Sequence, residues 1–351
     1  MSDGVLSGEA AEVPLGELIR AATLRPLSAA EAERAFGEVM EGRATPVQMA
    51  ALLVAIRVRG AVADEVAGGV RALRRAMVPV PVAATEELVD TCGTGGGALT
   101  TFNISTAAAL VAAGAGVRVA KHGNRSFTSR CGSADVLEAL GVRLDLTPEQ
   151  EAAVLDETGI VFMFAPLHHP AMRHVGPVRR ELGMPTLMNV LGPLTNPAMA
   201  RRQVVGVSDP GLLELIAGGL RALGHERALV VHGEPGMDEL SPIGPTEVIE
   251  LRDGELARST LDPREALGWE PADAEGLGGA EPEENARTIE RVLRGKAGGA
   301  ARAAVALNAG AAVYVAGKAE SLVEGVRTAE EALDGGAGWT ALEALRTATR
   351  R

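Results

Sequence analysis

Apolar residues recur three and four positions apart through roughly the first eighty residues, which is the spacing of the buried face of a helix. Residues 28–31 and 45–48 both have the form of a capping box, with Ser or Thr at the N-cap and Glu or Gln three positions later. A further apolar stripe covers residues 62–77, and prolines at 79 and 81 end the pattern. The sequence therefore predicts an N-terminal segment made only of helices.

The helix that begins after Thr45 and continues through Val58 is apolar nearly all round. A helix at the surface of a globular protein shows polar side chains on the face that meets water. A helix without such a face is either buried or part of a subunit interface.

From about Glu87 the pattern changes to short β-branched runs that alternate with helical stretches, one of which has a capped start at residues 147–150. The candidate strands are residues 88–91, 117–120, 160–164, 203–207, 228–231 and 247–251. Such alternation is typical of a parallel sheet with helices on its faces. The predicted fold class is α/β, a mainly parallel sheet flanked by helices, with a smaller all-helical N-terminal domain.

The chain has 351 residues, enough for two domains, and an apolar content of 46 % argues against disorder. No apolar run is long enough to span a membrane, and residues 1–4 lack the features of a signal peptide. We therefore expect no membrane partner and a cytoplasmic location. The acidic stretch 253–284, dotted with Pro and Gly, is typical of solvated loops around short elements.

Charge and cysteine content exclude several other classes. A net charge of −12 and an aromatic content of 2 % argue against a nucleic-acid partner, which needs a basic face and stacking rings. Cys92 and Cys131 do not form a Cys-x-x-Cys pair, so neither a zinc site nor a disulfide framework is expected. Both cysteines are expected to act as small apolar side chains.

A glycine-rich loop, residues 90–97, follows the first candidate strand. Its glycines allow backbone N–H groups to converge on an anion. A P-loop would end in Gly-Lys-Ser/Thr, and this loop has no lysine. Positions 93–98 fit the dinucleotide pattern G-x-G-x-x-A, but no acid between Asp90 and Asp135 is available for the ribose. A plain glycine turn is the remaining alternative for the loop taken alone.

The segment after the loop predicts a helix N-terminus. Asn103, Ser105 and Thr106 stand at the start of the strongly helical run 107–113, and any of them can cap it. A helix N-terminus with free N–H groups and hydroxyls is also a natural phosphate site. A simple cap is the alternative, and the cap and the anion site can coexist.

A basic loop, residues 121–130, follows the next candidate strand and combines cations with hydroxyls. Between Thr91 and Ala134 the chain has four Lys or Arg and no acid, a local reversal of sign. A solvated basic face is the usual alternative for such a cluster. Because ligands of parallel sheets bind beyond the carboxyl ends of the strands, we predict a polyphosphate site here.

Two acids and two histidines are further candidates. Asp238 and Glu239 follow a Gly- and Pro-containing loop, 232–236, where neighbouring acids can converge. A few carboxylates with phosphate oxygens suit Mg²⁺, although an ordinary solvated pair is the alternative. His168 and His169 lack the i, i+4 spacing of zinc enzymes, so a packed or substrate-lining role is favoured for them.

In their order along the chain these motifs resemble the anthranilate phosphoribosyltransferase family. The resemblance rests on residues 93–96, 103–106, 121–125, 132–135, 169–172, 178–183, 189–197 and 236–239. Each motif alone is weak, but the ordered combination is specific, and with the helical N-terminus it covers nearly the whole chain. It implies transfer of the phosphoribosyl group of 5-phosphoribosyl 1-pyrophosphate to the amine of anthranilate, in tryptophan biosynthesis.

The resemblance also implies the roles of individual residues. Lys121 and Arg125 would be catalytic, stabilising the leaving charge, and Ser105, Asp238 and Glu239 would hold Mg²⁺. The residues expected around the phosphoribosyl pyrophosphate are Gly93, Gly96, Gly97, Thr101, Asn103, Ile104, Ser105, Thr106, Lys121, His122, Gly123, Asn124, Arg125, Ser126, Phe127, Thr128, Ser129 and Ser133.

On the acceptor side, the resemblance implies that Asn124 and Arg179 face anthranilate. A guanidinium fork can pair with the anthranilate carboxylate, whereas a plain surface charge is the alternative for Arg179. Residues 1–85, joined by part of 170–200, are expected to form the helical domain, and residues 86–351 the domain that binds the phosphoribosyl donor. Together with the apolar helices, the resemblance suggests a homodimer through the helical domain.

One position departs from the family's pattern. The glycine loop of the family usually ends in Gly-Thr-Gly-Gly-Asp, and the fifth residue here is Gly97. We expect metal dependence to differ as a result. A pyrimidine nucleoside phosphorylase, which shares the general architecture, is the alternative enzyme, and a nucleic-acid-binding relative without catalysis is the alternative from another class.

Overall fold

The computed structural model of the protein describes residues 13–126, 130–270 and 272–351. Its N-terminal part is a bundle of four helices, α1 (Leu15–Leu24), α2 (Ala29–Met40), α3 (Pro46–Arg59) and α4 (Ala63–Ala76). Both predicted capping boxes are present, because Ser28 and Thr45 each accept a hydrogen bond from the backbone N–H three residues later. The prediction of an all-helical start is confirmed for the described residues.

A single seven-stranded sheet forms the centre of the rest of the chain. Its strands are β1 (Leu88–Gly93), β2 (Arg118–Gly123), β3 (Ile160–Phe164), β4 (Arg202–Gly206), β5 (Arg227–Gly233), β6 (Thr246–Arg252) and β7 (Glu255–Leu261), in the order β3-β2-β1-β4-β5-β6-β7. The first five in this order are parallel, and β6 and β7 are antiparallel additions at one edge. All six predicted strands are present, with ends displaced by no more than three residues.

Side chains alternate between two cores on opposite faces of the sheet. On β5, Leu229 and Val231 belong to one cluster, whereas Ala228 and Val230 belong to the other. The first cluster also contains the apolar residues of the C-terminal helices. The second includes the interior of the N-terminal bundle, so the bundle core continues onto one face of the sheet. This arrangement follows from the two-residue period of a strand.

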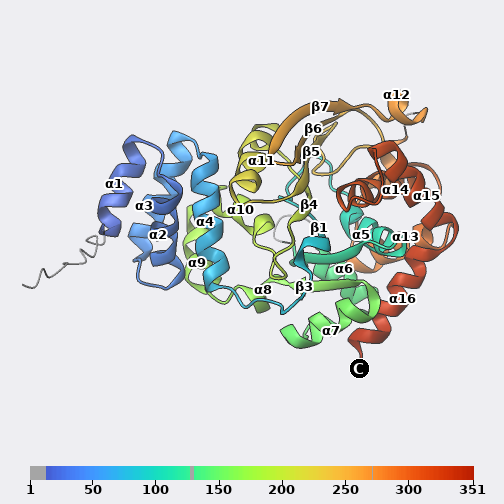
Figure 1. Cartoon of the computed structure of the whole chain (residues 1–351), viewed down its shortest axis with the longest axis horizontal. Coiled ribbons are helices and arrows are strands. Elements are labelled where there is room, and N and C mark those ends of the chain that lie inside the picture. Colours follow the sequence, from blue (N-terminus) through green and yellow to red (C-terminus); the bar gives the residue numbers. More distant parts are fainter. Residues whose placement is uncertain (1–12, 127–129, 271) are drawn as a thin grey trace, which may run out of the picture.

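The helices divide between these two faces (Figure 1). Those packed in the first cluster include α5 (Ile104–Gly114), α6 (Ser133–Ala139), α7 (Pro148–Thr158), α13 (Pro282–Leu293), α14 (Gly299–Val315), α15 (Leu322–Asp334) and α16 (Ala337–Thr349). Toward the bundle lie α9 (Met172–Leu182), α10 (Leu187–Leu191) and α11 (Leu213–Ala222). Short α8 (Ala165–His168) links β3 to α9, and α12 (Pro263–Leu267) follows β7.

The acidic stretch after residue 252 contains more regular structure than the sequence indicated. Residues 255–261 form β7, an edge strand whose side chains are mostly exposed, so they have no apolar alternation to reveal them. The signal that was available is Asp253-Gly254. Both residues have positive φ, and this dipeptide favours the tight turn of a β-hairpin. The prediction of loops around short elements was therefore wrong for this strand.

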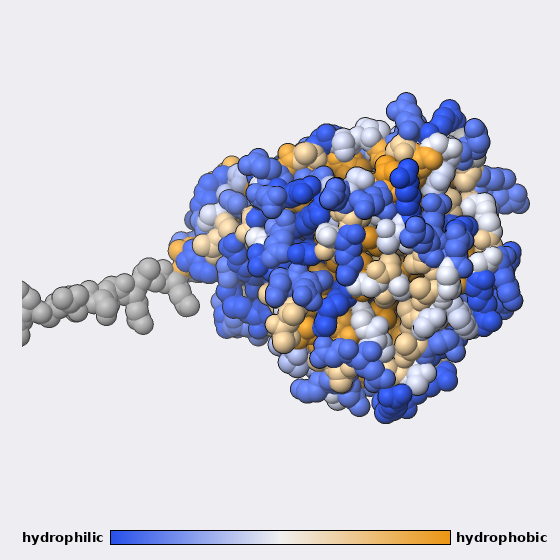
Figure 2. Space-filling view, turned by 45° about the vertical axis from the view of Figure 1, so that its right-hand side comes forward, coloured by the Kyte–Doolittle hydropathy of each residue, from blue (hydrophilic) through white to orange (hydrophobic). Residues whose placement is uncertain are grey.

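Hydrophilic residues cover most of the face seen in the space-filling view, and apolar residues reach that surface mainly in its middle part (Figure 2). Among the described residues, no helix is long and apolar enough to cross a membrane.

Candidate functional site

Four neighbouring parallel strands end in glycine at the same edge of the sheet: Gly93, Gly123, Gly206 and Gly233. A Cβ at Gly206 would overlap the backbone carbonyl of Asp238, and one at Gly93 would lie 2.5 Å from its carboxylate. At Gly233 a Cβ would overlap the carbonyl of the residue after Asp238. The acid loop, residues 234–239, therefore lies directly on the strand ends, in space that any larger residue would fill.

Glu239 is buried in this position, and Asp238 is partly buried. The backbone N–H of Gly95 donates to Asp238 Oδ2 over 2.8 Å, and Thr101 Oγ1 lies 3.2 Å from Glu239 Oε1. The other carboxylate oxygen of Glu239 is buried without a hydrogen-bond partner among the described residues. Burial raises the pKa of Asp238, and burial together with the charge of Asp238 raises the pKa of Glu239 well above its ordinary value. Two carboxylates in this arrangement favour the binding of a proton or of a metal cation.

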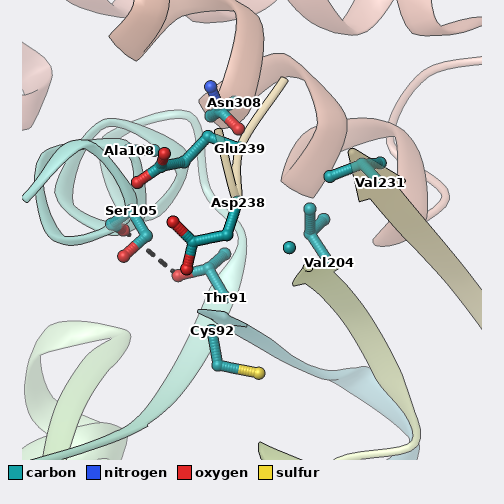
Figure 3. Close-up of a pocket in the computed structure, with 10 residues that line it drawn as sticks. Thr91, Cys92, Ser105, Ala108, Val204, Val231, Asp238, Glu239 and Asn308 are labelled. Atoms are coloured by element: carbon teal, nitrogen blue, oxygen red, sulfur yellow. Dashed lines mark hydrogen bonds between the residues drawn. The ribbon is translucent and has the colours of Figure 1, made fainter. Parts of the chain in front are cut away.

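Lys121 is buried beside the acids, on β2. Its ammonium donates to the backbone carbonyl of Thr91 and lies 3.3 Å from Ser105 Oγ. Burial lowers the pKa of Lys121, and the negative charge of Asp90 opposes that effect. Figure 3 shows the small pocket above Thr91, which Ser105 and Asp238 line, with Glu239 above them.

The N-terminus of α5 opens onto the same place. Asn103 occupies the N-cap position in the left-handed region (φ 65°), but its side chain does not cap the helix. Instead it donates to the carbonyl of Cys131 and accepts from Asn285 on α13. Thr106 Oγ1 is buried without a partner among the described residues. Since the first N–H groups of a helix have no acceptor in the helix, they remain available to an anion.

The basic loop forms the opposite rim. Arg125 is paired with Asp135 and Glu138 of α6, so its guanidinium is engaged in this structure. Ser133 Oγ lies 3.3 Å from the carbonyl of Asn124. Phe127, Thr128 and Ser129 lie outside the described residues.

Two histidines meet on the other face of β2. His122 Nε2 lies 3.2 Å from Nε2 of His169, which follows α8, and both rings are buried. Burial lowers the pKa of His122 well below its ordinary value and that of His169 to about 4. The pair is therefore neutral near pH 7, with one ring nitrogen donating to the other.

Arg179 lies half-buried on α9. Its guanidinium has no hydrogen bond or ion pair to any described residue, and burial lowers its pKa. A half-buried guanidinium without a carboxylate partner keeps its donors available to a ligand. The arrangement suits an incoming carboxylate.

The ends of the strands thus bring together most of the residues that the sequence predicted for the site. Their positions alone do not test the role of any of them. Around the acid pair and the start of α5 lie Gly93, Gly96, Gly97, Thr101, Asn103, Ile104, Ser105, Thr106 and Lys121. At the end of β2 and in the loop that follows it lie His122, Gly123, Asn124, Arg125, Ser126 and Ser133. Arg179 lies apart from both groups, on α9.

Asn308, which the sequence did not single out, holds the acid loop from the side of α14. Its amide accepts from the N–H of Leu240 and donates to the carbonyl of the same residue, both over 2.9 Å. The available signal was a polar residue in an otherwise apolar helix. At Gly97, a Cβ would lie 2.8 Å from the carbonyl of Gly236, so the position that departs from the family pattern is also tightly packed.

Family models match the chain in two parts. The helical bundle domain of a glycosyl transferase family matches residues 15–77, and the a/b domain of a glycosyl transferase family matches residues 85–339. The anthranilate phosphoribosyltransferase of Rubrobacter xylanophilus is 54 % identical over 334 residues, which cover 95 % of this chain and 97 % of that protein.

Solved structures agree with these matches. A crystal structure of anthranilate phosphoribosyltransferase from Thermus thermophilus is similar with a TM-score of 0.90 and 46 % identity, covering 95 % of this chain and 99 % of that one. The enzyme from Saccharomyces cerevisiae in complex with PRPP and Mg has a TM-score of 0.86 and 26 % identity, covering 96 % and 98 %. The yeast enzyme has also been solved in complex with 4-fluoroanthranilate, with a TM-score of 0.84, 26 % identity and coverage of 96 % and 99 %.

The buried acid pair should make stability depend on pH. The raised pKa of Glu239 means that the folded protein binds its proton more tightly than the unfolded chain does. The stability linked to that proton is fully present below about pH 4.5, the ordinary pKa, and is lost as pH rises through the raised value. Without divalent metal, Glu239→Gln should be more stable than the parent at pH 8 by about 1–3 kcal/mol.

Urea unfolding at pH 4.5 and pH 8 measures this difference. It should be small at the lower pH and large at the higher one, and the exposed Glu87→Gln should follow the parent at both. Equal stability of Glu239→Gln and parent at pH 8 would show that the carboxylate is not strained by its burial.

Proposed function

Because the chain belongs to the anthranilate phosphoribosyltransferase family, we propose which of its own residues carry each half of the reaction. The enzyme transfers the phosphoribosyl group from 5-phosphoribosyl 1-pyrophosphate to the amine of anthranilate, giving N-(5-phosphoribosyl)anthranilate and pyrophosphate, in tryptophan biosynthesis. We place both half-sites in one chain, at the carboxyl edge of the sheet, and the cytoplasmic location inferred from the sequence remains part of the proposal.

The donor half lies at the glycine loop and the start of α5. The observation that carries this assignment is the meeting of polar groups in one pocket: the unpartnered oxygen of Glu239 and the N-terminus of α5 at Ser105, with the ammonium of Lys121 3.3 Å from Ser105 Oγ. Helix N–H groups and a buried cation suit the pyrophosphate. Arg125 joins them once it exchanges its partners on α6 for phosphate oxygens.

The acid pair suits Mg²⁺, which is the cofactor of the family. Asp238 and Glu239 supply carboxylate oxygens, one of them unpartnered, and Ser105 supplies a hydroxyl in the same pocket. No cluster of three or more metal-ligating His, Cys, Asp or Glu occurs among the described residues. Two carboxylates and one hydroxyl are the protein ligands expected of a Mg²⁺ site whose remaining ligands are substrate phosphates and water. Bound there, Mg²⁺ would neutralise charge that develops on the leaving pyrophosphate.

The acceptor half lies on the side of α9. Arg179 offers an unpaired guanidinium to the carboxylate of anthranilate, and Asn124 faces the same substrate from the loop after β2. The neutral pair of His122 and His169 lines the space between the two elements without adding a charge that would compete for the carboxylate.

The mechanism that follows rests on positioning and charge. The amine of anthranilate is a neutral nucleophile, so it needs no strong base in order to attack C1 of the ribose. As the bond to pyrophosphate breaks, negative charge grows on the leaving oxygens beside Lys121 and the N-terminus of α5. Fixed donors aimed at developing charge, in a site already organised for it, lower the barrier more than equivalent groups in water.

The helical domain is proposed to form a homodimer. Three of its large apolar residues are about 80 % exposed, namely Leu24 of α1 and Val47 and Val58 of α3. Arg59 donates to the carbonyl of Ala22, which brings the end of α3 beside the end of α1. The proposed domains are residues 1–85 with part of 170–200, and 86–351, a division supported by family matches to 15–77 and 85–339.

Arg179→Ala tests the acceptor half. Loss of a charge-assisted pair costs about 1.5–3 kcal/mol, so KM for anthranilate should rise roughly 10- to 100-fold while KM for 5-phosphoribosyl 1-pyrophosphate changes little. The assay follows loss of anthranilate fluorescence in the presence of the donor and Mg²⁺. The neighbouring exposed Arg180→Ala is the matched control and should behave like the parent. An unchanged KM for anthranilate in Arg179→Ala would refute the assignment.

Leu24→Asp tests the dimer. A charge in an apolar interface is costly to bury, so light scattering should show the parent as a dimer and the variant shifted toward monomer. Met199→Asp is the control, because this residue is also partly exposed but lies outside the bundle, in the loop before β4. A parent that is monomeric at micromolar concentration, or a variant that stays dimeric, would contradict the proposal.

A further inference from the structure

A buried pair of ionisable groups lies outside the site described above. Glu151 on α7 and His168 on α8 are almost completely buried, and Glu151 Oε1 lies 3.0 Å from His168 Nε2. The other ring nitrogen, Nδ1, lies 2.9 Å from the carbonyl of Val78. A carbonyl can only accept, so Nδ1 carries a proton, and the contact with Glu151 holds a second one.

Both groups keep protons more tightly than usual. Burial raises the pKa of Glu151, with His168 opposing. Burial lowers the pKa of His168, but the hydrogen bond and charge of Glu151 and the carbonyl of Val78 more than offset this effect and raise it. A single proton shared between the two side chains accounts for both directions.

Stability alone does not explain this pair. Removing two charged groups from water costs several kcal/mol each, and apolar residues of the same volume commonly stabilise a core as well or better. Glu151 Oε2 also lacks a partner among the described residues, although apolar residues of α7 such as Val154 and Leu155 pack in the core beside it. A hydrogen-bonded pair differs from apolar packing because it fixes the orientation of the two side chains relative to each other.

The pair ties three segments together. The N–H of Val78 donates to the carbonyl of His168 over 2.8 Å, so His168 holds Val78 through both its ring and its backbone. Val78 lies in the connector between α4 of the bundle and β1 of the sheet. Glu151 therefore anchors, through His168, both α8 and the connector between the two parts of the chain.

The position of α8 matters to the acceptor half. This helix has only four residues, too few to be stable alone, and it is the link from the end of β3 to α9. His169, which contacts His122 over 3.2 Å, follows directly, and Arg179 lies on the helix after it. A rotation of α8 would therefore move both His169 and α9, which carries Arg179.

We propose that Glu151 and His168 form a positioning pair that fixes α8, and with it the His169–His122 contact and the direction of Arg179, for binding of the aromatic carboxylate acceptor. The inference rests on the proposed placement of the acceptor at Arg179. Glu151 does not touch the substrate, and its effect is transmitted through His168.

The test compares Glu151→Leu with Glu151→Gln in the full-length enzyme. A misplacement of about 1 Å can cost about a hundredfold, so a smaller shift of Arg179 in Glu151→Leu should raise KM for anthranilate roughly tenfold. KM for 5-phosphoribosyl 1-pyrophosphate should stay within about twofold, although the free energy of unfolding should fall because His168 Nε2 is left buried without a partner. Glu151→Gln keeps a hydrogen bond to His168 and should recover most of the affinity for anthranilate. Exposed Glu149→Leu on the same helix is the matched control.

A readout independent of activity comes from the ring nitrogens of the six histidines, followed by ¹⁵N NMR. Glu151→Leu should shift the signals of His122 and His169, whereas Glu149→Leu should not. Parental values of both the anthranilate KM and these signals in Glu151→Leu overturn the proposal. So does a parallel rise in both KM values, which is the result of a purely structural role.

Failure of the underlying assignment would look different. If Arg179→Ala leaves the KM for anthranilate unchanged, the acceptor is not bound at Arg179 and the proposed function fails at that point. The positioning of α8 is then judged on the histidine signals alone, and unchanged signals in Glu151→Leu overturn it.

Discussion

The close approach of the acid loop to the ends of β1, β4 and β5 is the constraint on which the site depends. Glycines at 93, 206 and 233 leave no Cβ where the backbone of Asp238 and Glu239 passes, and Asn308 holds the next residue from above. The two carboxylates are thereby fixed in a place where Glu239 is buried, Asp238 is partly buried and the two charges repel each other. A bound cation would relieve this repulsion, which is the physical ground for the proposed Mg²⁺ site.

The charged groups next to the acid loop form a sequence from Asp90 through Lys121 to the N-terminus of α5. Asp90, fully buried under the strand ends, accepts from the N–H of His122 and from Asn196, and its charge supports the buried ammonium of Lys121. The ammonium in turn lies beneath the N-terminus of α5. In the proposed site, the groups that bind the donor substrate gather on one face of β2, and the neutral histidine pair lies on the other. Under the proposed assignment, the alternation of side chains along β2 separates the two substrates.

Local signals in the sequence were sufficient for most of the fold. Ser28 and Thr45 begin helices through contacts three residues away, and the apolar strands carry their own pattern. The strand at 255–261 was not predicted because an edge strand needs no apolar face.

The candidate site also contains parts that the sequence could predict and parts that it could not. Its glycine and basic loops are contiguous motifs, but Asn308 acts on a residue 68 positions away, and Asn285 on one 182 positions away. Contacts of that range leave no pattern in a single sequence. The pairing of Arg125 with Asp135 and Glu138 likewise became visible only in three dimensions, and the catalytic role of Arg125 stays a prediction.

The central claim is that glycine at the strand ends sets the position of the acid pair. The affinity of Gly93→Ala for Mg²⁺ in the presence of pyrophosphate, measured by calorimetry, tests it most directly, because the added Cβ would lie 2.5 Å from Asp238 Oδ2 and displace the carboxylate while sparing the backbone. Gly16→Ala, where a Cβ meets nothing, is the control. The account predicts a loss of roughly 10- to 100-fold in affinity for Gly93→Ala alone. Parental affinity in that variant would contradict it.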